Sequence, residues 1–235
     1  MSDRCQAGYD QLARHYQWIE KLRFGNTLQN ARVSLLAELV DAKSNPRVLV
    51  LGDGDGRLLE AFLTFCPDGQ VTSVDVSPEM LRLQRERIAG LSKNVLANRP
   101  LDDAVKWIAT PIESFDFPSS TFDIVITAFF LDCFDERQLN QLLPQITNAL
   151  TPRANWYVVD FCQPERGLWR WWAKFWLAIM HTFFRWQTGL KSRRIVDPRP
   201  TLRSLGFELQ LEKTFHFEMV FAAIYQRRES KHRQN

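Results

Sequence analysis

Apolar and polar positions follow two different periods along this chain. The change of period separates an N-terminal helical region from a region of alternating strands and helices. Residues 8–43 carry apolar side chains at helical spacing, with a break near Gly25 and Asn26. The polar segment 91–104 predicts a loop. After Pro46 come short runs in which nearly every residue is apolar, at 47–51, 71–76, 105–109, 122–127 and 155–161. Helical patterns lie between them, at 56–66, 78–90 and 136–150.

Runs that are apolar on both faces are typical of parallel strands buried between helices. Their alternation with helical patterns predicts an α/β fold with a doubly wound, mostly parallel, seven-stranded sheet. A short helix is expected around Pro200–Ser204. The last two strands, near 207–214 and 217–226, are too close in sequence for a parallel crossover. We therefore expect them to form an antiparallel hairpin at the sheet edge.

The length of 235 residues suits one domain with a sizeable core. Within a single domain over 1–235 we expect four parts. These are N-terminal helices at 8–43, a cofactor-binding core at 47–161, an aromatic helix or lid at 166–190 and a terminal hairpin at 207–226.

The stretch VLVLGDGDGRLLE, residues 48–60, joins a strand to a helix through Gly52, Gly54 and Gly56. Glycines at such a turn let a ligand approach the backbone closely at the carboxyl edge of the sheet. The sequence therefore predicts a ligand-binding loop at this turn.

The composition of this loop does not suit a dinucleotide. Arg57 occupies the place of the third glycine of G-x-G-x-x-G, and Asp53 and Asp55 would repel a pyrophosphate. A ligand with positive charge and no phosphate fits better. S-adenosylmethionine, which carries a sulfonium and an ammonium group, is such a ligand.

A second motif, VTSVDVSPEML, ends a strand at Asp75. A carboxylate at this place accepts hydrogen bonds from ribose hydroxyls, in nucleotide-binding enzymes as well as in those that use S-adenosylmethionine. Ser77 and Pro78 predict the N-cap and first turn of a helix. This start places Met80 where it packs on an adenine ring.

Four motifs occur in order: YDQLARHY, VLVLGDGDG, VDVSPEML and FPSSTFDIVITAFFLD. Over about residues 8–161 the sequence thereby resembles the class I S-adenosylmethionine-dependent methyltransferases, in particular the small-molecule branch that includes quinone-biosynthesis enzymes. The resemblance implies that the glycines lie along the methionine part, Asp75 at the ribose, 110–112 at the adenine and 127–129 at the sulfonium. The cofactor-binding residues it implies are Gly52, Asp53, Gly54, Gly56, Asp75, Val76, Met80, Pro111, Ile112, Ala128 and Phe129.

Two positions depart from the family pattern. The family usually has an acidic residue where Val50 stands, and often an aspartate where Pro111 stands. We expect Asp53 to compensate for the first departure. Adenine contact is expected to rest on backbone and on apolar packing at Ile112.

Three residues are candidates for catalysis. Asp132 follows the fourth strand, Asp160 ends the fifth, and Tyr16 shares a helical face with Tyr9, where core packing is the alternative explanation. A general base is required only if the acceptor loses a proton during methyl transfer. No carboxylate cluster has the spacing of a metal site. An NAD(P)-dependent oxidoreductase and a non-catalytic methyltransferase-like binding module remain as alternatives.

The segment GLWRWWAKFWLAIMHTFFRWQTGL, residues 167–190, is rich in aromatic side chains. As a helix it would place Arg170, Lys174, His181 and Arg185 on one narrow stripe, opposite tryptophans and phenylalanines. Such a helix could be part of the core, a lid over a hydrophobic acceptor such as a lipid, a quinol or a polyaromatic molecule, an element that contacts an anionic membrane, or a dimer face.

The net charge, the cysteines and the N-terminal residues restrict the partners and the cellular location that we expect. A net charge of +3 is too small to indicate nucleic-acid binding. The four cysteines form no C-x-x-C pair, so neither disulfides nor a zinc site are expected. The polar N-terminus does not resemble a signal peptide. We expect a cytoplasmic protein, associated with membranes if residues 167–190 dock there.

Overall fold

The structure is a computed structural model of the chain. It describes residues 26–40, 45–91, 95–96, 99–162, 196–215 and 218–228. Tyr16, most of the N-terminal helical pattern and the aromatic segment 167–190 lie outside the described residues, so the predictions for them remain predictions.

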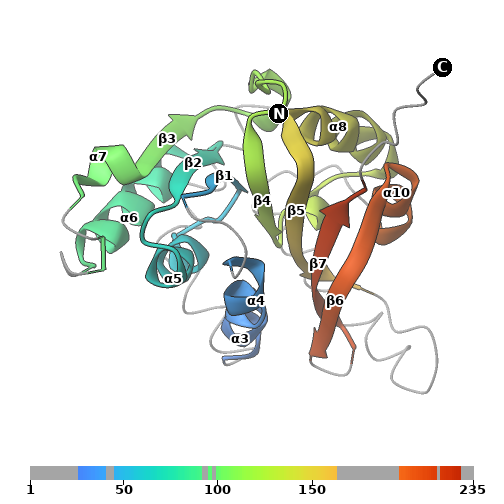
Figure 1. The fold of residues 1–235 in the computed structure, drawn as a ribbon, viewed down its shortest axis with the longest axis horizontal. Helices are drawn as coiled ribbons and strands as arrows, with labels where there is room; N and C mark the ends of the chain where they lie inside the picture. Colours follow the sequence, from blue (N-terminus) through green and yellow to red (C-terminus); the bar gives the residue numbers. More distant parts are fainter. Residues whose placement is uncertain are drawn as a thin grey trace.

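One seven-stranded sheet organises the described residues, in the order β3-β2-β1-β4-β5-β7-β6 (Figure 1). Neighbouring strands from β3 to β5 pair in parallel, whereas β7 is antiparallel to both β5 and β6. The predicted mostly parallel sheet with a terminal antiparallel hairpin is confirmed. The strands are β1 (Arg47–Leu51), β2 (Gln70–Asp75), β3 (Val105–Ala109), β4 (Phe122–Ala128), β5 (Leu150–Phe161), β6 (Phe207–Phe215) and β7 (Val220–Arg227).

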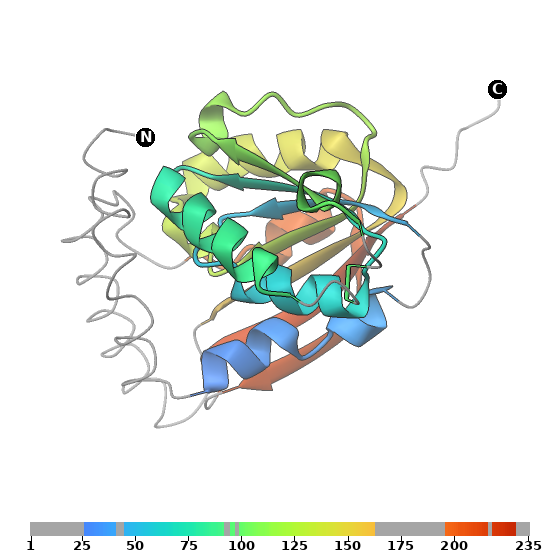
Figure 2. The ribbon, with the colours of Figure 1, turned by 90° about the vertical axis from the view of Figure 1, so that its left-hand side faces the viewer.

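Helices cover both faces of this sheet (Figures 1 and 2). Side chains of α3, α4, α5 and α6 form one apolar core with the first face, and those of α8 and α10 form another with the second. The helices are α3 (Thr27–Val33), α4 (Leu36–Val40), α5 (Arg57–Phe65), α6 (Pro78–Ala89), α7 (Leu101–Ala104), α8 (Glu136–Ala149) and α10 (Arg199–Ser204). Two short 3₁₀ turns, η1 (Ile112–Ser114) and η2 (Leu131–Cys133), follow β3 and β4.

Local capping fixes where two of these helices begin. The Ser77 hydroxyl accepts a hydrogen bond from the Met80 N–H at 3.1 Å, and Pro78 occupies the first turn of α6. At α8 the Asp135 carboxylate accepts from the Gln138 N–H at 2.8 Å, and the Gln138 amide oxygen accepts from the Asp135 N–H at 3.0 Å. This reciprocal pair satisfies two N–H groups that the helix itself leaves unbonded.

The sequence pattern misplaced some boundaries. The predicted loop at 91–104 ends in the single turn of α7, which begins directly after Pro100. Strand β5 begins at Leu150 and not at 155, and it pairs with β4 through a register shift. Arg153, with a φ of 62°, lies in this irregular part. Thr151, Pro152 and Arg153 separate Leu150 from the apolar run at 155–161, so the sequence pattern did not reveal the start of the strand.

Two turns also differ from the predicted elements. The second N-terminal helical pattern is divided into α3 and α4 by a turn at Ser34 and Leu35. The last strand begins at Val220, because Glu218 adopts a φ of 63° in the preceding turn.

Tyr157 on β5 joins α3 to the sheet. Its hydroxyl oxygen lies 3.0 Å from the carbonyl oxygen of Ala31 and 3.0 Å from that of Arg32. The side chain is fully buried, and burial raises the pKa of its hydroxyl. Since α3 has only seven residues, it depends on such tertiary contacts to stay in place.

We expect Tyr157→Phe to lower the free energy of unfolding by about 1–2 kcal/mol, because buried carbonyl groups lose their donor. Tyr225→Phe is the matched control. Tyr225 is also fully buried, but its hydroxyl has no hydrogen-bond partner among the described residues. Urea unfolding of both variants measures the difference. Equal losses in the two variants would contradict a stabilising role for the Tyr157 hydroxyl.

Candidate functional site

The carboxyl ends of the parallel strands form one connected edge. The Gly52 N–H, just after β1, donates to the Val74 carbonyl of β2 at 2.9 Å. The Phe129 N–H, just after β4, donates to the Val159 carbonyl of β5 at 2.8 Å. With the exception of Tyr16, the predicted site residues lie at this edge or in the turns and first helical residues that follow it.

The glycine loop, residues 52–56, adopts a backbone that favours glycine. Gly52, Gly54 and Gly56 have φ values of 64°, 68° and 83°. A Cβ atom on Gly52 would lie 2.4 Å from the Phe130 ring, and one on Gly56 would lie 2.9 Å from Cα of Gln84. A Cβ on Gly54 would have no heavy atom of the described residues within 4 Å. Gly54 therefore borders open space, as a ligand-contacting position requires.

The Asp53 carboxylate is bonded to the backbone of α5. Its carboxylate accepts hydrogen bonds from the Leu58 N–H at 3.3 Å and the Leu59 N–H at 2.9 Å, at the start of α5. Burial raises the pKa of Asp53 to about 7 against the lowering effect of these bonds. Its position gives no direct support to the expected compensation for Val50.

Asp55 is paired with two arginines. Its carboxylate accepts from Nε of Arg57 at 3.0 Å and from a terminal nitrogen of Arg87 at 3.3 Å. Asp53 and Asp55 therefore do not by themselves favour a cationic ligand, because both carboxylates are bonded to groups of the protein. The sequence could not reveal this, since Arg87 lies 32 residues away on α6.

The neighbouring residues occupy the predicted places. The Asp75 carboxylate, at the end of β2, accepts from the Ser77 N–H at 2.9 Å and is 8% exposed. Val76 is half-buried, and Met80 is buried on α6. After β3, Pro111 is half-buried and Ile112 is buried; after Ala128 at the end of β4, Phe129 is half-buried. Their roles toward ribose, adenine and sulfonium stay predictions.

Asp132 and Asp160 are brought together, which the sequence did not indicate. One Asp160 carboxylate oxygen accepts from the Asp132 N–H at 3.2 Å, and the other accepts from the Phe161 N–H at 2.8 Å. Burial raises the pKa of Asp132 to about 6, and burial together with the Asp132 charge raises that of Asp160 well above its usual range. The charge of Asp132 thus acts on the protonation of Asp160.

Four phenylalanines close in sequence to this carboxylate pair pack against one another in two pairs. Phe129 and Phe161 have ring centres 4.9 Å apart, and Phe130 and Phe134 have ring centres 5.1 Å apart. Phe129 has a φ of 53°, which is unusual for a residue other than glycine. Three of these rings follow β4 and the fourth, Phe161, ends β5, so phenylalanines flank Asp132 and Asp160 along the chain.

Arg32 is a site residue that sequence reasoning missed. It is only 4% exposed, and its guanidinium carbon lies 4.9 Å from the centre of the Phe129 ring. The helical pattern of 8–43 gave no sign of it, because a lone arginine in an amphipathic helix usually faces solvent.

Gln84 on α6 is a second missed residue. Its side-chain N–H donates to the Gly54 carbonyl at 2.9 Å, and its amide oxygen accepts from the Ser73 hydroxyl at 2.7 Å. Gln84 is fully buried. A buried polar residue on the inner face of the helical pattern 78–90 was the available signal.

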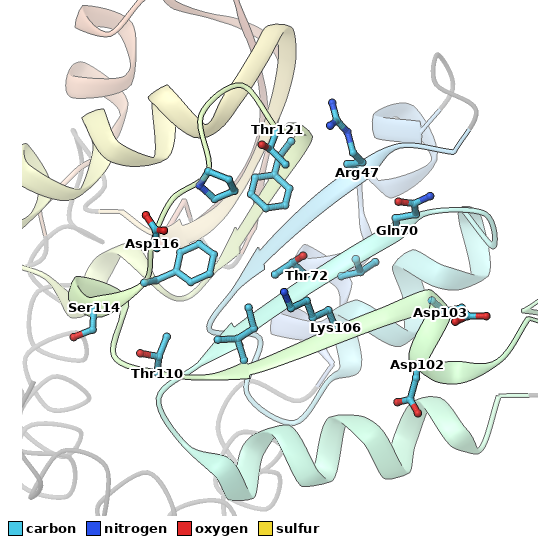
Figure 3. A pocket seen from close by; sticks show the side chains of 16 residues that line it. Arg47, Gln70, Thr72, Asp102, Asp103, Lys106, Thr110, Ser114, Asp116 and Thr121 are labelled. Atoms are coloured by element: carbon cyan, nitrogen blue, oxygen red, sulfur yellow. The ribbon is translucent and has the colours of Figure 1, made fainter.

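A separate cavity of about 720 Å³ lies over β2 and β3, on the sheet face opposite α6 (Figure 3). Thr72 and Lys106 point into it, Arg47 and Gln70 lie at one end and Thr110 at the other. Its lining contains neither the glycine loop nor the carboxylate pair. The cavity is therefore distinct from the glycine loop and from the carboxylate pair.

Comparison with known families identifies the core. Residues 48–153 match the family described as a methyltransferase domain. The ubiquinone/menaquinone biosynthesis C-methyltransferase UbiE of Shewanella halifaxensis is 28% identical over 134 residues, which are 57% of this chain and 49% of that protein. The chain thus spans about half the length of the curated relatives it matches.

Solved structures agree with the fold. N-methyltransferase NodS from Bradyrhizobium japonicum WM9, in complex with S-adenosylhomocysteine, has a TM-score of 0.65 at 17% identity, over 95% of this chain and all of that one (100%). The [4+2]-cyclase SpnF has a TM-score of 0.59 at 15% identity, over 83% of this chain and 79% of that one. Residues 48–153 therefore match a methyltransferase domain, and the chain is similar in sequence to UbiE and in fold to the N-methyltransferase NodS.

Proposed function

We propose that the protein transfers the methyl group of S-adenosylmethionine to a small hydrophobic acceptor, such as a lipid, a quinol or a polyaromatic molecule. The observation that carries this proposal is the contact between the buried Asp160 and the half-buried Asp132, whose neighbours along the chain include four phenylalanines. Phenyl rings favour an apolar acceptor over a strongly hydrated one, because they offer no hydrogen bonds in place of water.

Two further observations support an apolar acceptor. Phe129, Phe130 and Phe134 follow β4 and Phe161 ends β5, and binding pockets lined by aromatic side chains suit apolar ligands. The curated relatives carry the name of ubiquinone and menaquinone biosynthesis. Their identity to this chain is below 30%, so the choice among lipid, quinol and polyaromatic molecules is left to experiment.

Bound S-adenosylmethionine would supply an activated methyl group, which the acceptor would take in an in-line displacement with S-adenosylhomocysteine as the leaving group. The residues of this chain would position the two molecules, exclude water and accept a proton. The carboxylate pair suits proton acceptance, because one proton shared by two carboxyl groups leaves negative charge beside the acceptor. A phenol or an acidic carbon would pass its proton to this pair as the bond to the methyl group forms.

The cofactor assignments form part of the same proposal. We assign the open side of Gly54 to the methionine part, Asp75 to the ribose, and Met80 and Ile112 to the adenine. Ala128 and Phe129 would face the sulfonium. Tyr16, outside the described residues, stays a prediction as a residue that touches substrate or cofactor.

The alternatives differ in what supports them. An NAD(P)-dependent oxidoreductase gains no support from the family match, from UbiE or from NodS, all of which are described as methyltransferases. SpnF, by its title a cyclase, has a similar fold, so the fold alone does not establish methyl transfer.

Formation of S-adenosylhomocysteine with a panel of apolar acceptors separates a methyltransferase from a binding module. No turnover with any quinol, phenol or unsaturated lipid would count against the proposal.

We expect Gly54→Ala to weaken S-adenosylmethionine binding at least about tenfold, because the added methyl group enters the space assigned to the ligand. Gly206→Ala is the matched control. Gly206 has a φ of 86° and equally open surroundings, but it lies between α10 and β6. Both variants should lose about 1 kcal/mol of stability from backbone strain. Calorimetry that finds unchanged affinity for Gly54→Ala would remove the loop from the cofactor site.

We expect Asp160→Asn to reduce turnover about 100-fold or more while cofactor binding stays intact, because an asparagine cannot exchange a proton with Asp132 or with the acceptor. Asp123→Asn serves as control, since Asp123 binds the Arg47 N–H and the Thr151 hydroxyl at the opposite end of β4. In the wild type, kcat/KM should fall as pH drops below about 6, where Asp132 becomes protonated. Turnover of Asp160→Asn within twofold of wild type would exclude the pair from catalysis.

Membrane contact is a further part of the proposal. Among the residues that the structure describes, no helix combines the length and apolar character needed to cross a bilayer. The aromatic segment 167–190, with its basic positions, would instead rest on an anionic surface. We expect partial sedimentation with anionic liposomes at low salt and a blue shift of tryptophan fluorescence. Absence of both effects, or equal effects with neutral liposomes, would reject this contact.

A further inference from the structure

The cavity over β2 and β3 lies where the chain between β3 and β4 forms no long helix. Helix α6 contacts both strands on the opposite face of the sheet, and the described segment 110–121 contains only the short turn η1. This segment forms one wall of the cavity, which has a volume of about 720 Å³ (Figure 3). Cavities of this size are typical of sites for small molecules.

Lys106 brings a positive charge into this cavity. Its side chain points into the cavity from β3, and that of Thr72 does so from β2 (Figure 3). The two residues are register partners on neighbouring parallel strands, so their side chains leave the sheet next to each other on one face. In the part of the chain that the structure describes, neither side chain forms a hydrogen bond or an ion pair. An ammonium group and a hydroxyl group are therefore both available to a ligand.

The other charged residues of the lining lie at its margins. They are Arg47, Asp102, Asp103 and, on the loop wall, the exposed Asp116. Asp102 and Asp103 extend from α7 away from Lys106 (Figure 3). Nε of Arg47 lies 3.7 Å from the Asp123 carboxylate. Because water screens exposed carboxylates at the margin, Lys106 is the charge that sets which ligands the middle of the cavity favours.

Apolar side chains lie on both sides of this charge. Ile108 follows Lys106 by two residues on β3, so it belongs to the same face of the sheet. Phe115 lines the cavity from the loop, and its ring centre is 4.8 Å from that of Phe117 at an angle of 86° between the ring planes. A cation beside aliphatic and aromatic side chains suits a ligand with one negative charge and a flat apolar body.

We propose that this cavity binds a small organic anion in which one carboxylate is joined to a flat aromatic body. Lys106 and Thr72 donate hydrogen bonds to the carboxylate, and Ile108 and Phe115 contact the aromatic body. The cavity lining contains neither the glycine loop nor the carboxylate pair. This second site therefore does not depend on the proposed function.

Three probes that share one ring system and differ in charge test this site: 2-naphthoate, 2-naphthamide and 2-naphthylmethylamine. NMR titrations of the ¹⁵N-labelled full chain give each dissociation constant and the amides that shift. We expect the anion to bind about tenfold more tightly than the neutral amide, because charge-assisted hydrogen bonds are the stronger ones. The shifts should centre on Thr72, Lys106 and Ser114. No binding of the anion, equal binding of another probe, or shifts confined to other parts of the chain would overturn the proposal.

Lys106→Met removes the charge and keeps a side chain of similar length. The preference for 2-naphthoate over 2-naphthamide should disappear in this variant. Since Lys106 is exposed and bonded to no described side chain, the variant should fold as the wild type does. Thr72→Val removes only the hydroxyl group, so it should reduce the preference in part. An unchanged preference in Lys106→Met would overturn the placement of the carboxylate at this residue.

Lys213→Met is the matched control. Lys213 lies on β6, at the other edge of the sheet from β3, and its Nζ donates to the Ser34 carbonyl at 2.9 Å. The preference of this variant for the anion should equal that of the wild type. A loss as large as in Lys106→Met would mean that the net charge of the protein, and not the cavity, selects the anion. These titrations use neither the cofactor nor turnover, so their failure and a failure of the proposed methyl transfer are distinguishable.

Discussion

The hydrogen bonds between α6 and the glycine loop are the constraint on which the site depends. A loop with left-handed residues at every second position has few regular bonds of its own, so its shape has to come from neighbouring elements. Gln84 binds the Gly54 carbonyl while it also accepts from Ser73 of β2, and Arg87 binds both the backbone and the carboxylate of Asp55. The loop, α6 and β2 therefore form one unit, and β2 brings Asp75 to the same place.

The parts of the fold that local pattern determines were predictable. Apolar runs gave the strands, Ser77 and Pro78 gave the start of α6, and glycine spacing gave the loop. What could not be predicted depends on partners distant in sequence. Asp132 and Asp160 were each candidates, but their contact exists only because β4 and β5 are neighbours in parallel register.

The two aspartates of the glycine loop show why a charged residue is hard to interpret from sequence alone. Their charges looked like ligand-binding charges because sequence shows no partners for them. Asp53 turns to the first amides of α5, and Asp55 turns to arginines, one of them on α6. The glycine spacing and the other motifs lead to the same cofactor without these two charges. Residues 48–153 match a methyltransferase domain, which agrees with that inference. Arg32 shows the reverse case, a charge without a motif whose position only the packing of α3 reveals.

The backbone of Phe129 has a consequence for how this protein could evolve or be engineered. A left-handed conformation at a bulky residue costs on the order of 1 kcal/mol, and glycine or asparagine would relieve it. The phenyl ring at this position, however, is stacked on Arg32 and packed against Phe161. Selection for stability alone would therefore remove the ring, and selection for the site alone would keep it. Under the proposed function, Phe129 is a position where stability and activity favour different residues, and stabilising designs should leave the native residue in place.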